Sequence, residues 1–567
     1  AFGDAEAILN FRYGTNTLVI GSAVTGSAGL TKGSAGNLSL LGPVDMGGVI
    51  DFANGRLTVG DTVNGHIRLS RDGTLEMLSG SSISGAVSVS GGNVYLTNTC
   101  AISGALDIGE SRTVTMSNGG SVTGRITVFS GGTLTLNSGS VISGNLTNFG
   151  TFNYNSTDTE PITISLDGLG TVYQRNVNMP LTLFQSPGEH WVGNIVPTEG
   201  ATVILDGEPD ATTVVNNMLP EPARTKWTIE NGVWIFNPLH PSKNLSADVT
   251  LNGGVLTVTP ETRRFTFYTA GGTNTLTITG GVLMDQPETD WSLRFGNHHG
   301  SWEQTGCNFI GVQTGGIVLV QSKEYLHLGS LADHTTATYD LSGGTVYAFG
   351  QSDNAVSIGS GTNNNSLAAF TLRGSGKLVS RKRIYGNRAE EGANQVFAFQ
   401  GGTLATASYE AVNLRSEPGG ARGTLFNEGG TLAPGDFGVP GRTLVNGSYT
   451  NAPNAVIALD IGGASQANSF TNGAGYHDHL MITGNAVLDG ALRISLINGF
   501  LPDPASLFYA ISCDNPMTFA AGGFSNAEDN QVWAEDGFAR FDVTLSNDSK
   551  HLLLGNAALN QWAGASG

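Results

Sequence analysis

The chain has 567 residues, of which 81 are glycine and only 13% are charged, which is about twice the usual share of glycine and about half the usual share of charge. Its formal net charge of −19 argues against nucleic acid and anionic membranes as partners, because both are negatively charged. No apolar stretch approaches the roughly 20 residues that a membrane-spanning helix needs. Gly-Gly, Asn-Gly and Ser-Gly steps interrupt short apolar runs throughout, which predicts an all-β chain with many turns.

The N-terminal segment, residues 1–44, contains one apolar run followed by closely spaced glycine and serine. The run, which comprises Thr17, Leu18, Val19 and Ile20, predicts a strand. This segment could form the first coils of a repeat, a cap or an extended arm. The chain starts at AFGDAEAILNF, without an initiator methionine or a basic-then-apolar leader. We therefore expect a mature end left after removal of a signal peptide.

Residues 45–150 carry the most regular repeat. Five glycines at spacings of 20, 19, 20 and 20 each precede a short alternating apolar run: Gly65, Gly85, Gly104, Gly124 and Gly144. A second apolar run lies about ten residues away in each repeat, so two short strands are predicted per repeat. A unit of about 20 residues cannot bury an apolar face alone and must stack on copies of itself. The repeat predicts an elongated parallel β-solenoid, or β-helix, whose outward positions are mostly Ser, Thr and Asn.

Residues 151–244 interrupt this rhythm with clustered proline and tryptophan. Nine prolines fall in this segment, and proline cannot donate a hydrogen bond to a β-ladder. The cluster predicts a boundary or a separate, irregular β module. Trp191, Trp227 and Trp234 also lie here, and their rings could either stack on a sugar or pack at an internal interface.

Residues 245–440 carry a second repeat, marked by Gly-Gly or Gly-x-Gly followed by an apolar strand. Counted from the second glycine, the steps from Gly254 to Gly430 are 27, 35, 28, 32, 26 and 28. This spacing predicts wider and less even coils, with about three strands each. A strand-rich C-terminal module is predicted for residues 441–567.

The densest polar group of the wider coils is the sequence DWSLRFGNHHGSWEQ. It contains Trp291, His298, His299 and Trp302, which could form a sugar or metal site. Adjacent histidines point to opposite faces of a strand, so both could bind one metal ion only from a loop. An insertion loop packed by its own aromatic side chains explains the same residues.

A basic run stands out on this acidic chain. It is centred on Arg381, Lys382 and Arg383, with Lys377 and Arg388 nearby. The run lacks the larger positive field that nucleic-acid binding requires. It could contact an acidic patch on a neighbouring copy of the chain, or form a solvated face.

Candidate catalytic and metal-binding residues are sparse. Cys100, Cys307 and Cys513 match no metal-ligand or redox spacing and are predicted to be isolated buried thiols. His477 and His479 alternate on a candidate strand, but two imidazoles without a third ligand make a weak metal signal. We therefore predict no catalytic, cofactor-binding or metal-binding residue, and a protein that is not an enzyme.

A family resemblance covers roughly residues 245–560. The segments LHLGS (326–330) and VSIGS (356–360) are each followed by a polar loop, an apolar strand and a Gly-containing turn, and GGTV or GGTL recurs at residues 343, 401 and 429. This pattern resembles the autotransporter-associated β-strand repeats of large bacterial surface proteins. The passage from Leu432 onward resembles the one that closes such passengers, although the chain shows neither their barrel nor their sorting tail. The resemblance implies architecture and a bacterial surface location, and it implies no particular activity.

These observations predict a secreted or cell-surface structural protein that assembles with copies of itself into a head-to-tail fibre, coat or surface layer. The strand at residues 17–20 and the C-terminal module are the candidate joints, because the open ends of a solenoid expose strand edges. A carbohydrate-binding adhesin that contacts surface polysaccharide through its tryptophans is the first alternative. A polysaccharide lyase or hydrolase on a β-helix is the second.

Overall fold

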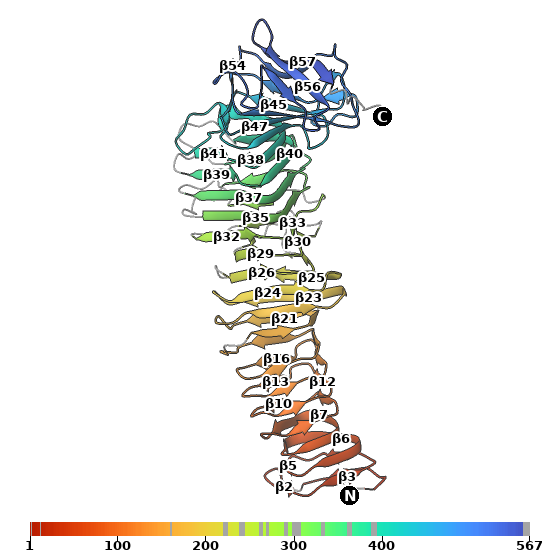
Figure 1. Ribbon diagram of the computed structural model, residues 1–567. Coiled ribbons are helices and arrows are strands. Elements are labelled where there is room, and N and C mark those ends of the chain that lie inside the picture. The colour runs from red at the N-terminus through yellow and green to blue at the C-terminus, as the bar shows by residue number, and fades with distance from the viewer. Residues whose placement is uncertain are drawn as a thin grey trace, which may run out of the picture. The chain divides into compact units, whose positions relative to one another are not determined.

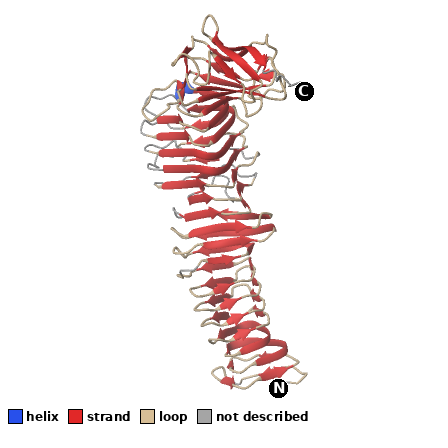
Figure 2. Cartoon of the chain, in the orientation of Figure 1, coloured by secondary structure: helices blue, strands red, loops and turns tan. Residues whose placement is uncertain are grey.

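A computed structural model shows an all-β chain whose strands stack in parallel coils (Figures 1 and 2). It describes residues 1–559 except 2, 12, 159–160, 219–224, 238–243, 246, 260–264, 268–271, 288–292, 297–307, 330–334, 360–365 and 387–393. Within these residues the helical structure is limited to the 3₁₀ turn η1 (Ala411–Asn413). The chain divides into two compact units, residues 1–239 and 240–567. The predicted all-β parallel solenoid is confirmed.

The N-terminal segment forms coil strands, since β1, β2 and β3 each pair in parallel with a strand of the next coil. Thr17 lies opposite Asn37, and Ile20 lies opposite Leu40. The first coils consist of β1 (Ala7–Leu9), β2 (Thr17–Ile20), β3 (Val24–Gly26), β4 (Leu30–Lys32), β5 (Asn37–Leu40), β6 (Val44–Val59) and β7 (Thr62–Met77).

The regular ladder has three strands per coil, where the sequence predicted two. The missed strands have two residues each, too few to show an alternating pattern. The ladder consists of β8 (Ser82–Ile83), β9 (Val87–Val89), β10 (Asn93–Leu96), β11 (Ala101–Ile102), β12 (Leu106–Ile108), β13 (Thr113–Met116), β14 (Ser121–Val122), β15 (Ile126–Val128), β16 (Thr133–Leu136), β17 (Val141–Ile142), β18 (Leu146–Asn148) and β19 (Thr151–Tyr154). Val94, Val114, Leu134 and Phe152 lie in register and are fully buried, so they form one continuous apolar column.

The glycine spacing of the ladder has a steric cause. A Cβ atom on Gly124 would lie 2.1 Å from the carbonyl oxygen of Gly104, and one on Gly144 would lie 1.9 Å from that of Gly124. Gly85 and Gly104 face the same obstacle from the glycine one coil below. Successive backbones therefore approach so closely at this corner that no side chain fits between them.

The proline- and tryptophan-rich segment continues the parallel stacking. Its strands are β20 (Ile162–Ile164), β21 (Leu166–Gln174), β22 (Leu181–Gln185), β23 (Gly188–Pro197), β24 (Thr202–Gly207), β25 (Ala211–Met218), β26 (Thr225–Ile229) and β27 (Val233–Phe236). They form two parallel series, β21–β23–β25–β27 and β20–β22–β24–β26. Pro161, Pro180 and Pro187 lie outside strands, and Pro197 ends β23. The prolines therefore change the coils without ending the solenoid.

The second unit begins with wider coils of three strands. These are β28 (Asn244–Leu245), β29 (Ala247–Leu251), β30 (Val255–Val258), β31 (Phe265–Phe267), β32 (Thr273–Ile278), β33 (Val282–Met284), β34 (Leu293–Phe295), β35 (Asn308–Val320), β36 (Leu326–Leu328), β37 (Thr336–Ala348), β38 (Asn354–Ile358), β39 (Leu367–Leu372), β40 (Lys377–Gly386), β41 (Asn394–Phe399), β42 (Thr403–Glu410), β43 (Thr424–Asn427) and β44 (Thr431–Pro434). Inside them, the rings of Phe295, Tyr339, Phe370 and Phe397 form one stacked column with centroids 5.0 to 5.7 Å apart.

The C-terminal module ends the parallel coils with antiparallel strands. β53 pairs in parallel with β50 on one edge and antiparallel with β57 on the other, and β56 pairs antiparallel with both β55 and β57. The module consists of β45 (Arg442–Asn446), β46 (Ser448–Asn451), β47 (Val456–Ile461), β48 (Ser465–Gln466), β49 (Tyr476–His477), β50 (His479–Ile482), β51 (Ala486–Leu488), β52 (Ala491–Leu496), β53 (Phe508–Cys513), β54 (Thr518–Phe519), β55 (Gln531–Trp533), β56 (Ala539–Leu545) and β57 (His551–Leu559).

Candidate functional site

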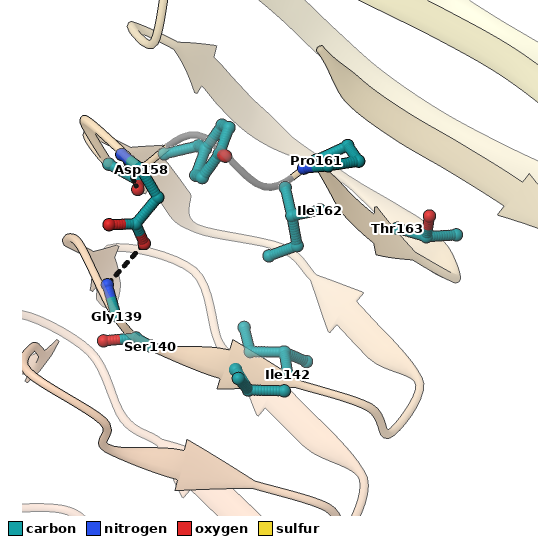
Figure 3. A pocket seen from close by; sticks show the side chains of 10 residues that line it. Gly139, Ser140, Ile142, Asp158, Pro161, Ile162 and Thr163 are labelled. Atoms are coloured by element: carbon teal, nitrogen blue, oxygen red, sulfur yellow. Dashed lines mark hydrogen bonds between the residues drawn. The ribbon is translucent and has the colours of Figure 1, made fainter. Parts of the chain in front are cut away.

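A pocket of about 570 Å³ lies in the first unit, between β17 and β20, where one side of the regular ladder is interrupted (Figure 3). This volume is typical of sites that hold small ligands. The pocket is lined by Gly139, Ser140, Val141, Ile142, Tyr154, Ser156, Asp158, Pro161, Ile162 and Thr163.

The interruption is confined to one side of the coil. On that side β8, β11, β14 and β17 pair in series, but among the described strands β17 has no partner beyond β14, and β20 pairs only with β22. On the other two sides the pairing continues without a break, with Leu146 opposite Leu166 and Thr151 opposite Thr171. The strands β17 and β20 of successive coils are therefore unpaired in an otherwise continuous stack.

A proline explains the missing pairing. The 20-residue step from Leu146 to Leu166 would place Pro161 over Val141. Val141 donates its backbone N–H to the carbonyl of Gly120 at 3.0 Å. Pro161 has no N–H with which to make the equivalent bond to the carbonyl of Ser140.

The free edge of β17 presents its peptide groups to the pocket. The N–H groups of Val141 and Ser143 donate to the coil below, to Gly120 and Val122 at 3.0 and 3.1 Å. In a parallel strand, alternate residues turn their N–H and C=O groups to opposite edges. The N–H and C=O groups of Ile142 therefore point to the pocket side, where Ile162 extends toward Ile142 from the coil above (Figure 3).

The polar wall of the pocket is built by the turn after β19. Asp158 accepts a hydrogen bond from the backbone N–H of Gly139, and its own N–H donates to Ser156 Oγ at 3.0 Å (Figure 3). Tyr154 is buried, which raises the pKa of its hydroxyl, and Asn176 Nδ2 donates to that hydroxyl at 3.3 Å. Ser140 Oγ is also buried and has no hydrogen-bond partner among the described residues. The lining thus combines an apolar floor, one carboxylate and an unpaired strand edge.

A second polar cluster, which the sequence did not reveal, lies in the wider coils. Arg294, His327 and Ser357 stand in register on β34, β36 and β38 and are all buried. Arg294 Nη2 lies 3.2 Å from Glu324 Oε2. Burial, together with the charge of Arg294, lowers the pKa of His327 to about 3, so this imidazole is neutral at physiological pH. The cluster could be found in the sequence only by aligning the segments LRF, LHL and VSI, in which its three residues take the middle position. That alignment requires the register of the three strands to be known.

A third cluster lies in the C-terminal module. Asp478 accepts backbone hydrogen bonds from Gly441 and Asp460 at 2.6 and 2.7 Å, and burial raises its pKa well above the usual value. His479 Nε2 contacts Ser512 Oγ at 3.0 Å, and Ser512 Oγ contacts His551 Nδ1 at the same distance. The two hydrogen bonds to the carboxylate of Asp478 therefore hold the backbone at Gly441 and at Asp460 together.

The sequence had placed His477 and His479 on one face as a weak metal signal. His477 instead packs edge-on against Phe508, with ring centroids 5.2 Å apart, whereas His479 contacts Ser512. In the described part of the chain, no group of three or more His, Cys, Asp or Glu side chains has the arrangement of a metal site.

The tryptophans occupy different environments. Trp227 and Trp234 are each 1% exposed, and their indole N–H groups donate to Thr225 Oγ1 and to the carbonyl of Asn231 at 3.1 and 2.8 Å. Their rings are core side chains and cannot stack on a sugar. Trp191 is 51% exposed. Trp291, Trp302, His298 and His299 lie outside the described residues.

The residues predicted to contact another copy are partly engaged within the chain. Arg383 lies 3.4 Å from Glu410 and donates to Asn354 at 2.7 Å. Arg381 is exposed and its guanidinium lies 3.9 Å from the ring centre of Phe349, and Lys382 is also exposed. In β2, Thr17 and Val19 are exposed, whereas Leu18 and Ile20 are half-buried.

Two smaller sequence expectations concern single residues. Cys100 and Cys513 are free, buried thiols, as predicted, and burial raises the pKa of both; Cys307 lies outside the described residues. Asp107 and Arg125, which are isolated within their own coils in the sequence, come from neighbouring coils and lie 3.6 Å apart.

No known protein-family model matches the chain, and no curated protein matches it in sequence. In the described part of the chain, no helix is long and apolar enough to cross a membrane. The fold therefore defines the class of the protein, a parallel β-solenoid, and its function has to be argued from the site and the surfaces.

Proposed function

We propose that the protein is an extracellular or bacterial cell-surface structural protein, in which the solenoid units act as stiff, protease-resistant spacers. The observation that carries this proposal is the unbroken series of parallel rungs over a fully buried apolar column in the regular ladder. Backbone hydrogen bonds in such a stack run along its axis, so bending or local opening breaks several at once.

The outward face of the ladder supports this role. Hydroxyl side chains of neighbouring coils contact each other, as in Ser79 with Thr99 at 3.3 Å and Ser138 with Thr157 at 2.8 Å. Such short polar side chains solvate the surface, and their hydroxyls are weak nucleophiles unless a neighbouring base activates them. We propose on this basis that the protein is not an enzyme. The resemblance to autotransporter-associated repeats and the low charge support the surface location.

Self-association remains part of the proposal, with one change of geometry. The two edges of β53 are already occupied by β50 and β57, so β53 is a poor joint for a head-to-tail fibre. The exposed Arg381 and Lys382 favour lateral contact, because they offer positive charge to an otherwise acidic copy of the chain.

Electron microscopy and limited proteolysis of the purified chain test this function. A stiff spacer gives particles of uniform length that resist protease except at loops, and self-association gives laterally ordered arrays that disperse in high salt. Particles with no preferred length, or rapid cleavage within the ladder, would rule out a spacer. Monomers at all concentrations and salt levels would rule out self-association alone.

Carbohydrate binding is a second candidate, favoured by an exposed apolar column. Phe129, Phe149 and Leu169 occupy equivalent positions in three successive coils, and each is about half exposed. The two exposed phenylalanine rings and the leucine side chain could lie against a polysaccharide chain. A glycan array compares the native chain with Phe129→Ser/Phe149→Ser and with Trp191→Ala, and equal signals from all three would exclude these surfaces.

A further inference from the structure

We propose that the pocket between β17 and β20 is an acceptor site for an extended peptide strand, which pairs with the edge of β17 that β20 leaves free. This inference is independent of the spacer role, because it rests on the interrupted ladder alone. A partner that adds a strand to an open sheet edge gains affinity from main-chain hydrogen bonds and specificity from side-chain pockets.

The occupied edge of β17 shows what its free edge can bind. On the lower edge, Ser121 and Val122 of β14 lie opposite Val141 and Ile142. On the upper edge, the N–H and C=O groups of Ile142 and the carbonyl of Ser140 face the pocket without a strand to receive them among the described residues. Unpaired peptide groups beside an apolar floor are costly to leave empty, and a strand satisfies them in the same way as β14 does.

The residues that line the pocket also determine which side chains the bound peptide should carry. Val141, Ile142 and Ile162 provide an apolar surface, which suits a β-branched residue at the centre of the bound strand. Asp158 is the carboxylate of the lining and lies beside Gly139, at the N-terminal end of β17. In a strand that pairs in parallel with β17, a lysine or arginine before the apolar residue would therefore find an opposite charge. The net charge of −19 also attracts a basic peptide. The partner is therefore a short extended segment in which a basic residue precedes an apolar one.

The first test uses a peptide that copies the natural neighbour of β17. The probe acetyl-KGSVTG-amide carries a lysine followed by residues 120–124, and its binding to the full chain is measured by titration calorimetry. In the register of β14 on β17, the N–H of the probe's serine faces the carbonyl of Ser140. N-methylation of this serine removes that backbone donor and leaves the side chain unchanged. We expect at least about tenfold weaker binding of the methylated peptide.

The second test changes the pocket. Pro161→Thr restores the missing backbone donor and closes the ladder, so peptide binding should be lost while thermal stability is kept. Ile162→Trp fills the cavity without repairing the ladder and should also abolish binding. Pro187→Thr, at an exposed proline outside the lining, is the matched control and should bind the peptide as the native chain does. Asp158→Asn should remove the preference for lysine over alanine at the first position of the probe.

Four results would overturn the proposal. These are no binding of the probe to the native chain, equal binding of the N-methylated probe, full binding by both Pro161→Thr and Ile162→Trp, and occupation of the pocket by a soluble oligosaccharide or fatty acid in place of the peptide. The spacer role would survive any of these results, because electron microscopy and proteolysis measure it separately.

Discussion

The regular ladder of the first unit and the wider coils of the second solve the same packing problem differently. In the ladder, aliphatic residues fill the narrow interior, and glycine at one corner allows the coils to approach. In the wider coils, stacked aromatic rings fill the interior, and a glycine such as Gly344, with φ of +72°, makes the turn. Among the described residues of the wider coils, Arg294 and His327 are buried side by side. The narrow first coils bury a charged side chain too, since Lys32 is 1% exposed and its ammonium donates to the carbonyl of Asn54 at 2.6 Å. A wide coil thus accommodates two neighbouring buried polar side chains, whereas the narrow coil pairs its buried charge with backbone carbonyls.

The largest expected effect comes from opening the aromatic column of the wider coils. Phe370 is fully buried and stacks on both Tyr339 and Phe397, at 5.4 and 5.7 Å. Phe370→Ala should cost about 4 kcal/mol, because it removes a large side chain from a packed interior. Hydrogen exchange resolved by peptide measures the loss around residues 337–399. Phe129→Ala, at an exposed ring, is the control and should change little.

The steric origin of the glycine ladder gives the next effect. Gly124→Ala would place its methyl group 2.1 Å from the carbonyl oxygen of Gly104, and we expect about 3 kcal/mol of destabilisation, the upper end for overpacking. Gly80→Ala is the contrast: Gly80 has φ of +77° but open space around it, so only the strained backbone, about 1 kcal/mol, is at stake. Equal losses for both variants, measured by urea unfolding, would mean that backbone conformation and not coil approach selects the ladder glycines.

The features that could be predicted from the sequence are those that each coil shows within its own residues. Glycine spacing and apolar alternation were sufficient to predict parallel coils, because both are local consequences of each coil resting on the one before it. The two-residue strand at Ser121 and Val122 was missed because it has no period of its own. The gap at Pro161 was missed for another reason. Once the coil length of 20 is known, the sequence places this proline over Val141, but nine prolines considered together predicted a boundary or a separate β module and not one missing strand pairing.

The buried charges could not have been predicted in the same way. Arg294 and His327 are 33 positions apart in coils of uneven length, so their contact depends on the register of two strands that are distant in the sequence. Asp107 and Arg125 illustrate the same limit at the surface, because each is alone in its own coil and gains its partner from the coil beside it. Interactions between coils follow from register, and the register becomes uncertain wherever the repeat length varies.

The buried histidine predicts that acid weakens the wider coils. The folded pKa of His327 is lowered to about 3 from the usual 6.5, so its stabilising contribution is present above pH 6.5 and is lost as the pH falls toward 3. Below pH 6.5, one such group lowers the free energy of unfolding by up to about 1.4 kcal/mol per pH unit, or by about 2 kcal/mol between pH 6.5 and pH 5. Burial raises the pKa of Asp285 to about 6. The contribution of Asp285 to folding stability therefore changes in the opposite direction and is lost as the pH rises through that value.

The variant His327→Gln separates these two groups. It should flatten the acid side of the stability profile of the second unit and leave the Asp285 contribution unchanged. Hydrogen exchange at pH 5 and pH 7, followed in peptides from residues 308–358, provides the measurement. An unchanged pH dependence in the variant would assign the acid sensitivity to other groups, among them His479, whose pKa is lowered to about 4 by burial and nearby positive charge.

The smallest expected effect concerns the surface of the ladder. Asp107 and Arg125 lie 3.6 Å apart with side chains 27% and 63% exposed, and an exposed ion pair contributes less than about 1 kcal/mol. Arg125→Ala should therefore shift the unfolding midpoint by no more than a degree or two, and 1 M salt should abolish even that difference, since it screens charges beyond about 3 Å. A larger, salt-insensitive loss would mean that the aliphatic stem of Arg125 packs on the outer face, so that this face contributes more than solubility to the stack.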